Sequence, residues 1–466
     1  MREENEFFYR SDETLEIVQR YENMLKHNRN TFFDVIDFEN IIDYYLNSDN
    51  SQRASQAVDI AFSMHPNSTE IQLKKAELLI MDNRYGEALE ILNVLVKMEP
   101  ENGDLHFLKG QTHLALNDLK SAHESFWYAT NSYSDDKVDL LYRIASLYQD
   151  IGEVKYALRY LLYGYSITKN SLNILFELAY SYEQLGDLPK SEDFYNKYLD
   201  INPFSSSVWY NLGIVYTRNG VFTKALEAYG FALAIEPDNT SAIHNLANTY
   251  ATIEKYADAE KAFVELIEFE PENPRIFASI GECNEKLGNY DKALDAYAKC
   301  LEIDAQYSDA IFGIGITQLK KGNLPLALEQ IKKAIEIEHS NYDYWLGLAK
   351  VHFEMGSDNE AMEAYKEATN LNPDEIDAYI GIIELLLFEE KFSSVEELYH
   401  EIAEKFVANA TIKILYAAAL YLQGKSKLAL TLLKQAKKLN VFTAEEFLAV
   451  VSIIDDPKFI LKLKEL

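Results

Sequence analysis

The sequence predicts an all-α protein built from about twelve copies of a 34-residue helix–turn–helix unit. Three observations predict it: the 34-residue period itself, an alanine at position 20 of ten units, and a proline at position 32 of six units. Single units cannot bury their apolar faces alone, so neighbouring units must stack into an array. The units begin at residues 35, 69, 103, 138, 172, 206, 240, 274, 308, 342, 376 and 410, and only Lys137 breaks the period.

The unit 206–239 shows the pattern most clearly. Its first half places four residues at i, i+3, i+4 and i+7, which puts them on one helical face: Trp209, Leu212, Gly213 and Tyr216. Gly220 follows and can supply the left-handed C-cap that ends a helix. The second half repeats the helical spacing with Ala225, Tyr229 and Ala232. Pro237 then ends the second helix, because the residue before a proline avoids the helical region.

This unit resembles the tetratricopeptide repeat (TPR) family. The match consists of Trp, Leu-Gly, Tyr, Ala, Tyr, Ala and Pro at unit positions 4, 7, 8, 11, 20, 24, 27 and 32. The resemblance implies a right-handed superhelical α-solenoid. It also implies that positions 2, 5, 9 and 12 of the first helices line a concave groove, which in this family holds an extended peptide or a partner helix.

The segments outside the repeats predict helical caps. Residues 1–34 contain apolar residues at helical spacing, so we expect an N-terminal capping helix from about Asp12 to His27. The array of twelve repeats then occupies residues 35–443. Thr443-Ala-Glu-Glu446 has the pattern of a capping box, which predicts that residues 444–466 form a C-terminal capping helix and tail.

Composition restricts the function. The chain has 75 acidic and 44 basic residues and a formal charge of −31, which argues against nucleic acid and anionic membranes as partners. The charge is uneven, because residues 410–466 carry +4 and the first 409 residues carry −35. The N-terminus has charges where a signal peptide needs an apolar run, and runs such as Ile414–Leu422 are too short to cross a bilayer. Cys283 and Cys300 fall on packing positions, which favours a reducing cytoplasm.

No motif indicates catalysis, a cofactor or a metal. The sequence lacks GxGxxG, GxxxxGK[ST], HExxH and CxxC. His106 and His113 would share a helix face, as a metal pair could, but they occupy the aromatic core positions 4 and 11. We therefore expect packing residues there, and a protein that is not an enzyme.

The candidate binding residues are aromatic side chains that the core pattern does not require. They stand at position 5, or in one case position 9, of the first helices: Phe107, Tyr142, Phe176, Tyr180, Tyr210 and Phe312. Aromatic residues dominate binding hot spots, so these side chains could form a protein-binding stripe. They could equally be packing residues between adjacent first helices. Their acidic neighbours Asp139, Glu183 and Glu282 suggest a ligand with basic and apolar residues.

Two further hypotheses concern the partner. A carboxylate clamp for a chaperone tail is only fragmentary, because His244 and Ser279 replace the Lys and Asn that such a clamp needs beside Asn248 and Arg275. The sequence therefore favours a non-catalytic scaffold or adaptor that binds a protein segment in its groove. The alternative is a self-associating structural protein, in which the basic C-terminal end meets acidic surface of another copy.

Overall fold

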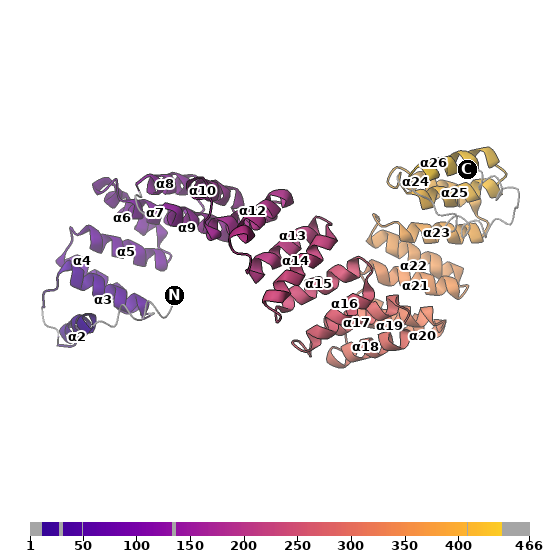
Figure 1. Cartoon of the computed structure of the whole chain (residues 1–466), viewed down its shortest axis with the longest axis horizontal. Helices are drawn as coiled ribbons and strands as arrows, with labels where there is room; N and C mark the ends of the chain where they lie inside the picture. The colour runs from indigo at the N-terminus through magenta and orange to yellow at the C-terminus, as the bar shows by residue number, and fades with distance from the viewer. Residues whose placement is uncertain (1–11, 28–30, 49, 133–136, 408, 440–466) are drawn as a thin grey trace. The chain divides into compact units, whose positions relative to one another are not determined.

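The computed structural model describes residues 12–27, 31–48, 50–132, 137–407 and 409–439 (Figure 1). These residues form 25 α-helices, α2 to α26, and the described part of the chain contains no β-strand. The chain divides into two compact units, residues 1–208 and 209–466. The C-terminal capping helix expected in residues 444–466 lies outside the described residues.

The first unit holds the helices up to the start of α13. They are α2 (Asp12–His27), α3 (Val35–Asn47), α4 (Ser51–Met64), α5 (Thr69–Met81), α6 (Tyr85–Met98), α7 (Gly103–Ala115), α8 (Leu119–Ser132), α9 (Lys137–Asp150), α10 (Val154–Ile167), α11 (Leu172–Gln184) and α12 (Leu188–Ile201). The helix α2 has the bounds that its apolar spacing predicts, and its Val18, Tyr21 and Met24 are buried against α3 and α4.

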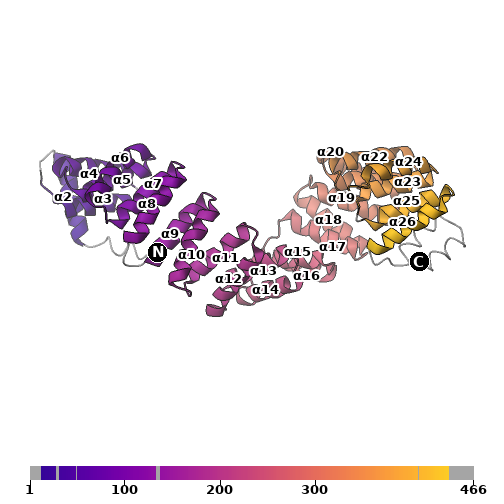
Figure 2. The same ribbon diagram turned by 90° about the horizontal axis from the view of Figure 1, so that it is seen from above.

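The second unit holds the remaining helices. They are α13 (Ser206–Arg218), which begins at the boundary, α14 (Phe222–Ile235), α15 (Thr240–Thr252), α16 (Tyr256–Ile267), α17 (Pro274–Lys286), α18 (Tyr290–Ile303), α19 (Ser308–Lys320), α20 (Leu324–Ile337), α21 (Tyr342–Glu354), α22 (Asp358–Leu371), α23 (Asp377–Phe388), α24 (Phe392–Ile402), α25 (Ala410–Leu422) and α26 (Ser426–Leu439). Within the unit, helices that follow one another in the chain pack together (Figure 2).

The helix positions follow the predicted register. Each first helix begins within one residue of its expected unit start, and all ten alanines at position 20 are fully buried. First helices of neighbouring repeats also contact each other. For example, α17 contacts α19, and α19 contacts α21. The small residue at position 20 lets the two helices of a repeat approach closely, and the chain is therefore an all-α solenoid of stacked helix pairs.

The turn inside the repeat has the same geometry wherever the structure describes it. Position 15 is in the left-handed region in eleven repeats, with φ between 58° and 79°. Seven of these residues are glycines, for which this region costs nothing. Asn83, Asn117, Glu254 and Glu390 occupy it in the other four. The left-handed residue ends the first helix and directs the chain into the second.

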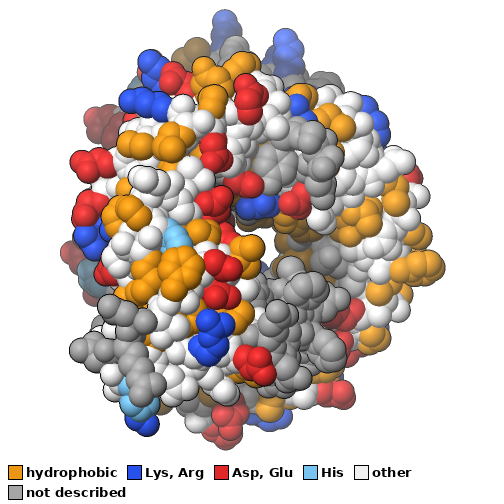
Figure 3. All heavy atoms as spheres, turned by 90° about the vertical axis from the view of Figure 1, so that its left-hand side faces the viewer, with side chains coloured by type: hydrophobic (Ala, Val, Ile, Leu, Met, Phe, Trp, Pro, Cys, Tyr) orange, Lys and Arg blue, Asp and Glu red, His pale blue; other side chains and the backbone are white. Residues whose placement is uncertain are grey.

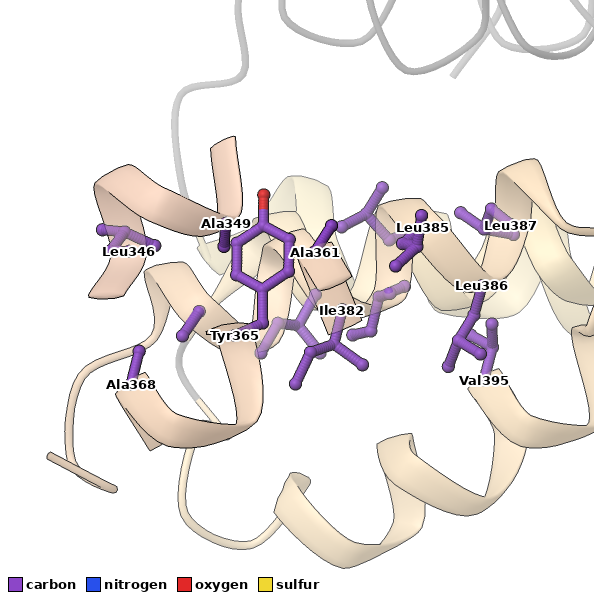
Figure 4. Packing of buried hydrophobic residues seen from close by; sticks show 14 of the residues in the cluster. Leu346, Ala349, Ala361, Tyr365, Ala368, Ile382, Leu385, Leu386, Leu387 and Val395 are labelled. Atoms are coloured by element: carbon purple, nitrogen blue, oxygen red, sulfur yellow. The ribbon is translucent and has the colours of Figure 1, made fainter. Parts of the chain in front are cut away.

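The core of the second unit is continuous across its last repeats. Figure 4 shows Tyr365 between Ala349, Ala361 and Ile382, so one aromatic ring fills the space between neighbouring repeats. The repeat 376–409 departs from the pattern, with Ile383 and Val395 in small-residue positions, and both are fully buried. Its second helix, α24, has 11 residues, whereas most second helices have 14.

Candidate functional site

The second unit contains a groove of about 640 Å³. The first helices α15, α17, α19 and α21 line it, together with Tyr297 of α18. Since these helices come from four successive repeats, the groove is a product of the stacking and belongs to no single repeat. We treat it as the candidate binding site.

Apolar side chains form part of the groove lining. Ile316, Leu346 and half-buried Phe312 line the groove, and the ring centroid of Phe312 lies 4.7 Å from that of Tyr344. Gly347 brings α21 close to α19, because a Cβ added there would lie 2.6 Å from Cε2 of Phe312. Phe312 therefore does two things: it packs between first helices, and it presents part of its ring to the groove.

One acidic side chain of the groove, Glu285, already has an ion-pair partner and a hydrogen-bond donor within the protein. Glu285 is buried, and the Nζ of Lys320 lies 2.9 Å from its Oε1. The hydroxyl of Tyr297 donates a hydrogen bond of 3.5 Å to its Oε2. Such a buried carboxylate is stable only while its cation and its hydrogen bonds remain in place. Glu285 thus links α17, α18 and α19 and has little capacity left for a ligand.

A second acidic group also has a structural partner. The hydroxyl of Tyr344 donates a hydrogen bond of 2.6 Å to Oδ1 of Asp309. Burial, reinforced by this carboxylate, raises the pKa of Tyr344 above its ordinary value. The hydroxyl therefore stays protonated as a donor, and it holds α21 against α19 at one wall of the groove.

Several charged side chains of the groove face solvent. Arg275, Glu282, Lys286, Asp343 and Lys350 are exposed, and among the described residues none of them forms an ion pair. Desolvation by the surrounding walls raises the pKa of Glu282, although Lys286 acts in the opposite direction. An incoming cation would relieve the cost of keeping this carboxylate charged. The groove therefore offers anionic contacts (Glu282, Asp343) and cationic contacts (Arg275, Lys286, Lys350) beside its apolar side chains.

The predicted aromatic stripe divides between the two units. In the first unit Phe107 is buried, its ring centroid 5.7 Å from that of Phe126 and 4.5 Å from Cζ of Arg143. Tyr142 and Phe176 are half-buried, and the Phe176 ring lies 6.0 Å from that of Tyr195. Tyr180 is 40% exposed. Packing thus accounts for Phe107 fully and for Tyr142 and Phe176 in part, whereas Tyr180 has substantial free surface.

The other two members of the stripe lie in the second unit. The hydroxyl of Tyr210 accepts a hydrogen bond of 3.2 Å from Nδ2 of Asn245, and the two residues line a smaller pocket of about 270 Å³ with His244. Phe312 lies in the larger groove. Of the residues that line the groove, the sequence had singled out Phe312 and Glu282 but not Lys350, although its place at position 9 of a first helix was a usable signal.

Family comparison agrees with the repeat architecture. The model of the tetratricopeptide repeat family matches residues 61–312 and 311–441. This chain belongs to the tetratricopeptide repeat family. No curated protein sequence matches it. TPR proteins generally act as protein-interaction scaffolds.

Solved TPR structures are similar to this chain at low identity. The yeast Tom70 structure is 14% identical, with 92% of this chain and 99% of that chain covered and a TM-score of 0.48. The Cut9 complex with Hcn1 is 14% identical, with 92% and 89% covered and a TM-score of 0.43. YrrB, described as a TPR protein with an unusual peptide-binding site, is 23% identical over 38% of this chain and 92% of that chain, with a TM-score of 0.35.

His106 and His113, the two histidines that could have formed a metal pair, have separate partners. The Nε2 of His106 lies 2.9 Å from the carbonyl oxygen of Pro100, and its ring stacks on Tyr128. The Nδ1 of His113 lies 3.6 Å from a carboxylate oxygen of Asp118. Within the described residues, no three His, Cys, Asp or Glu side chains come together as a metal site would require.

The cysteines, the apolar runs and the clamp fragment were also subjects of sequence-based expectations. Cys283 and Cys300 are buried free thiols, as their repeat positions predict. No helix in the described part of the chain combines the length and the apolar character of a membrane span.

The residues of the clamp fragment lie together in the structure, since Asn248, Arg275 and Ser279 all line the large groove. The Nδ2 of Asn248, however, lies 2.9 Å from Nδ1 of His244.

Proposed function

We propose that this TPR protein is a non-catalytic scaffold or adaptor that holds a peptide or helix of a partner protein in the groove of its second unit. The observation that carries the proposal is the groove itself, about 640 Å³ on the first helices of four repeats. Its apolar side chains can anchor a side chain of the partner, and its exposed charges have no ion-pair partner among the described residues. Ligands usually bind in concave clefts of this kind.

The lining suggests the chemistry of the partner. An apolar side chain would lie over the free part of Phe312, and a basic side chain would pair with Glu282. Arg275, Lys286 and Lys350 add cationic contacts, so the ligand also carries an acidic group or a carboxylate. The partner segment is therefore apolar with charges of both signs, which extends the basic and apolar ligand expected from the sequence.

The energies fit a moderate affinity that needs several contacts. Completing the burial of a half-buried phenylalanine contributes about 0.8–1.5 kcal/mol, since full burial contributes about 1.5–3 kcal/mol. An exposed ion pair adds about 0–1 kcal/mol. Association costs about 4 kcal/mol or more. A single anchor is therefore insufficient, and the partner must follow the groove across more than one repeat.

The aromatic residues of the first unit are a second surface for the same function. Tyr180 is the favoured contact because 40% of its surface is exposed, with Tyr142 and Phe176 beside it in the pattern. Phe107 serves as an internal comparison, because it is buried and a ligand could reach little of it. We also place the protein in the cytoplasm, since both thiols are free, as in a reducing compartment.

A peptide-display selection against the whole protein tests the proposal. Selected peptides are measured by fluorescence anisotropy against the wild type and against Glu282→Gln and Lys350→Glu, which alter exposed groove residues. Lys366→Glu is the matched control, because Lys366 is an exposed lysine on the second helix α22. We expect both groove variants to weaken binding about 3- to 10-fold, which corresponds to about 0.7–1.4 kcal/mol, and the control to bind like the wild type. Equal binding by all four proteins would contradict the groove as the site.

A further inference from the structure

The helix α26 has an exposed basic face. Residues 410–439 contain six lysines and no acidic residue, in a chain whose net charge is −31. Lys427, Lys434 and Lys438 are exposed and are spaced by seven and four residues, so they lie along one face of α26. Leu428 beside them is 58% exposed. This face therefore combines a row of cations with free apolar surface.

The helix α16 of the same unit has the opposite character. Glu265, Glu268 and Glu272 are exposed at the end of α16 and in the turn that follows it. Val264 and Phe269 lie among them and are 49% and 46% exposed. The α16 face thus presents acidic groups around apolar side chains.

These acidic residues destabilise the isolated chain. Glu265 and Glu268 lie at the C-terminal end of α16, where the helix dipole is negative and anionic side chains are unfavourable. Among the described residues no ion pair offsets Glu265, Glu268 or Glu272. A cationic surface docked at this end of the helix would remove the cost, and the α26 face is such a surface.

We propose that the α26 face of one copy docks on the α16 face of a second copy. Each face supplies what the other lacks: three lysines against three glutamates, and Leu428 against Val264 and Phe269. The exposures show that the two faces do not cover each other within one chain. The contact is heterologous, so each added copy uses one of its two faces and leaves the other free, and the copies form an open chain or a ring.

The overall negative charge does not prevent this contact at physiological salt. Charges separated by more than a Debye length, about 8 Å at 0.15 M salt, are largely screened. The local attraction between the two faces acts at shorter range and remains. At about 1 M salt the Debye length falls to about 3 Å, and the contact weakens. Self-association at moderate salt that declines at high salt is therefore the signature.

The test uses sedimentation velocity of the full chain at increasing concentration, at about 0.15 M and about 1 M salt. The two face variants are Lys427→Glu/Lys434→Glu/Lys438→Glu and Glu265→Lys/Glu268→Lys/Glu272→Lys. The control is Lys332→Glu/Lys333→Glu/Lys366→Glu, which changes the net charge as the α26 variant does but lies on α20 and α22. Circular dichroism and thermal melting confirm that each variant is folded.

The wild type and the control are expected to associate, and each face variant alone to remain monomeric. An equimolar mixture of the two face variants is expected to associate again, because each keeps one intact face and their reversed faces are also complementary. A monomeric wild type, a control that loses association as the α26 variant does, or a mixture that stays monomeric would overturn the proposal. If the wild type is monomeric and its α26 lysines instead bind a polyglutamate peptide, the basic face serves a different acidic partner.

Discussion

Gly281 lies directly against the ring of Tyr297. A Cβ added at Gly281 would be 2.5 Å from Cε1 of that ring, and one added at Gly313 of the next repeat would be 2.3 Å from its Cζ. The tyrosine is therefore held between two glycines from successive first helices. This arrangement fixes how closely α17, α18 and α19 pack, and hence the width of the groove that they line.

The substitution Gly281→Ala should destabilise the second unit. Alanine favours the helix by about 1 kcal/mol over glycine, but the added methyl overpacks the tyrosine and costs about 1–3 kcal/mol. We expect a net loss of up to about 2 kcal/mol, measured as a lower thermal midpoint by calorimetry. Gly230→Ala is the control, because nothing lies within 4 Å of that Cβ, and it should be neutral or stabilising.

The substitution Glu254→Gly should stabilise the protein. Glu254 has φ of 60° at a turn position where seven other repeats have glycine. A side chain in the left-handed region costs about 1 kcal/mol, which glycine avoids. The expected gain in the free energy of unfolding is about 0.5–1 kcal/mol. Glu363→Gly, on the exposed face of α22, should lower stability by about 1 kcal/mol. Equal effects at both sites would refute the turn argument.

The half-buried Glu177 predicts a pH-dependent stability. Desolvation raises its pKa above the ordinary 4.5, so the folded chain binds this proton more tightly than the unfolded chain. Stability therefore falls as pH rises from about 4.5 through the raised value. Glu177→Gln removes this cost and keeps an acceptor for Gln149, which donates a 2.9 Å hydrogen bond to Glu177. The variant should be more stable than the wild type at pH 7 and equally stable below pH 4.5, measured by urea unfolding.

Glu70 should show the opposite dependence of stability on pH. Its hydrogen bond from Ser68, 2.7 Å long, holds its pKa below the ordinary value. A carboxylate with a lowered pKa stabilises the folded state above the ordinary pKa of 4.5, and this stabilisation disappears as pH falls through the lowered value. Glu70→Gln should thus be less stable than the wild type at neutral pH. Parallel pH profiles for the Glu70 and Glu177 variants would contradict this assignment.

The cysteines should be inert in the folded protein. Burial raises the pKa of Cys283 to about 12 and that of Cys300 to about 11, so both remain thiols at neutral pH. Because the thiolate is the reactive form, iodoacetamide should modify neither residue in native protein and both in denaturant, read by mass spectrometry. Rapid modification of native protein would contradict the burial of the two thiols in the packing of α17 and α18.

The repeat register could be predicted because each repeat must meet the same packing demands. The period, the alanines at position 20 and the turn at Gly220 follow from close helix approach and from left-handed backbone geometry, and both are local properties. The cap from Asp12 to His27 was predictable from its apolar spacing. The C-terminal cap lies outside the described residues and stays a prediction.

The candidate site was predictable only in part. Position 5 identified Phe312, but the sequence could not show that Phe107 is buried under Arg143 while Tyr180 remains exposed. Those differences depend on the residues that the neighbouring repeats bring to each contact. The pairing of Glu285 with Lys320 joins residues 35 positions apart, and no spacing rule within one repeat contains it.

A site-specific crosslinker tests the central claim most directly. A photoreactive amino acid is placed at Ser279, which lines the groove without being part of the buried core, or at Lys366 on α22. Each protein is irradiated with a peptide selected against the wild type, and the crosslinked residue is mapped by mass spectrometry. The scaffold function predicts a peptide adduct at position 279 and none at position 366. Adducts at 366 alone, or equal adducts at both positions, would contradict it.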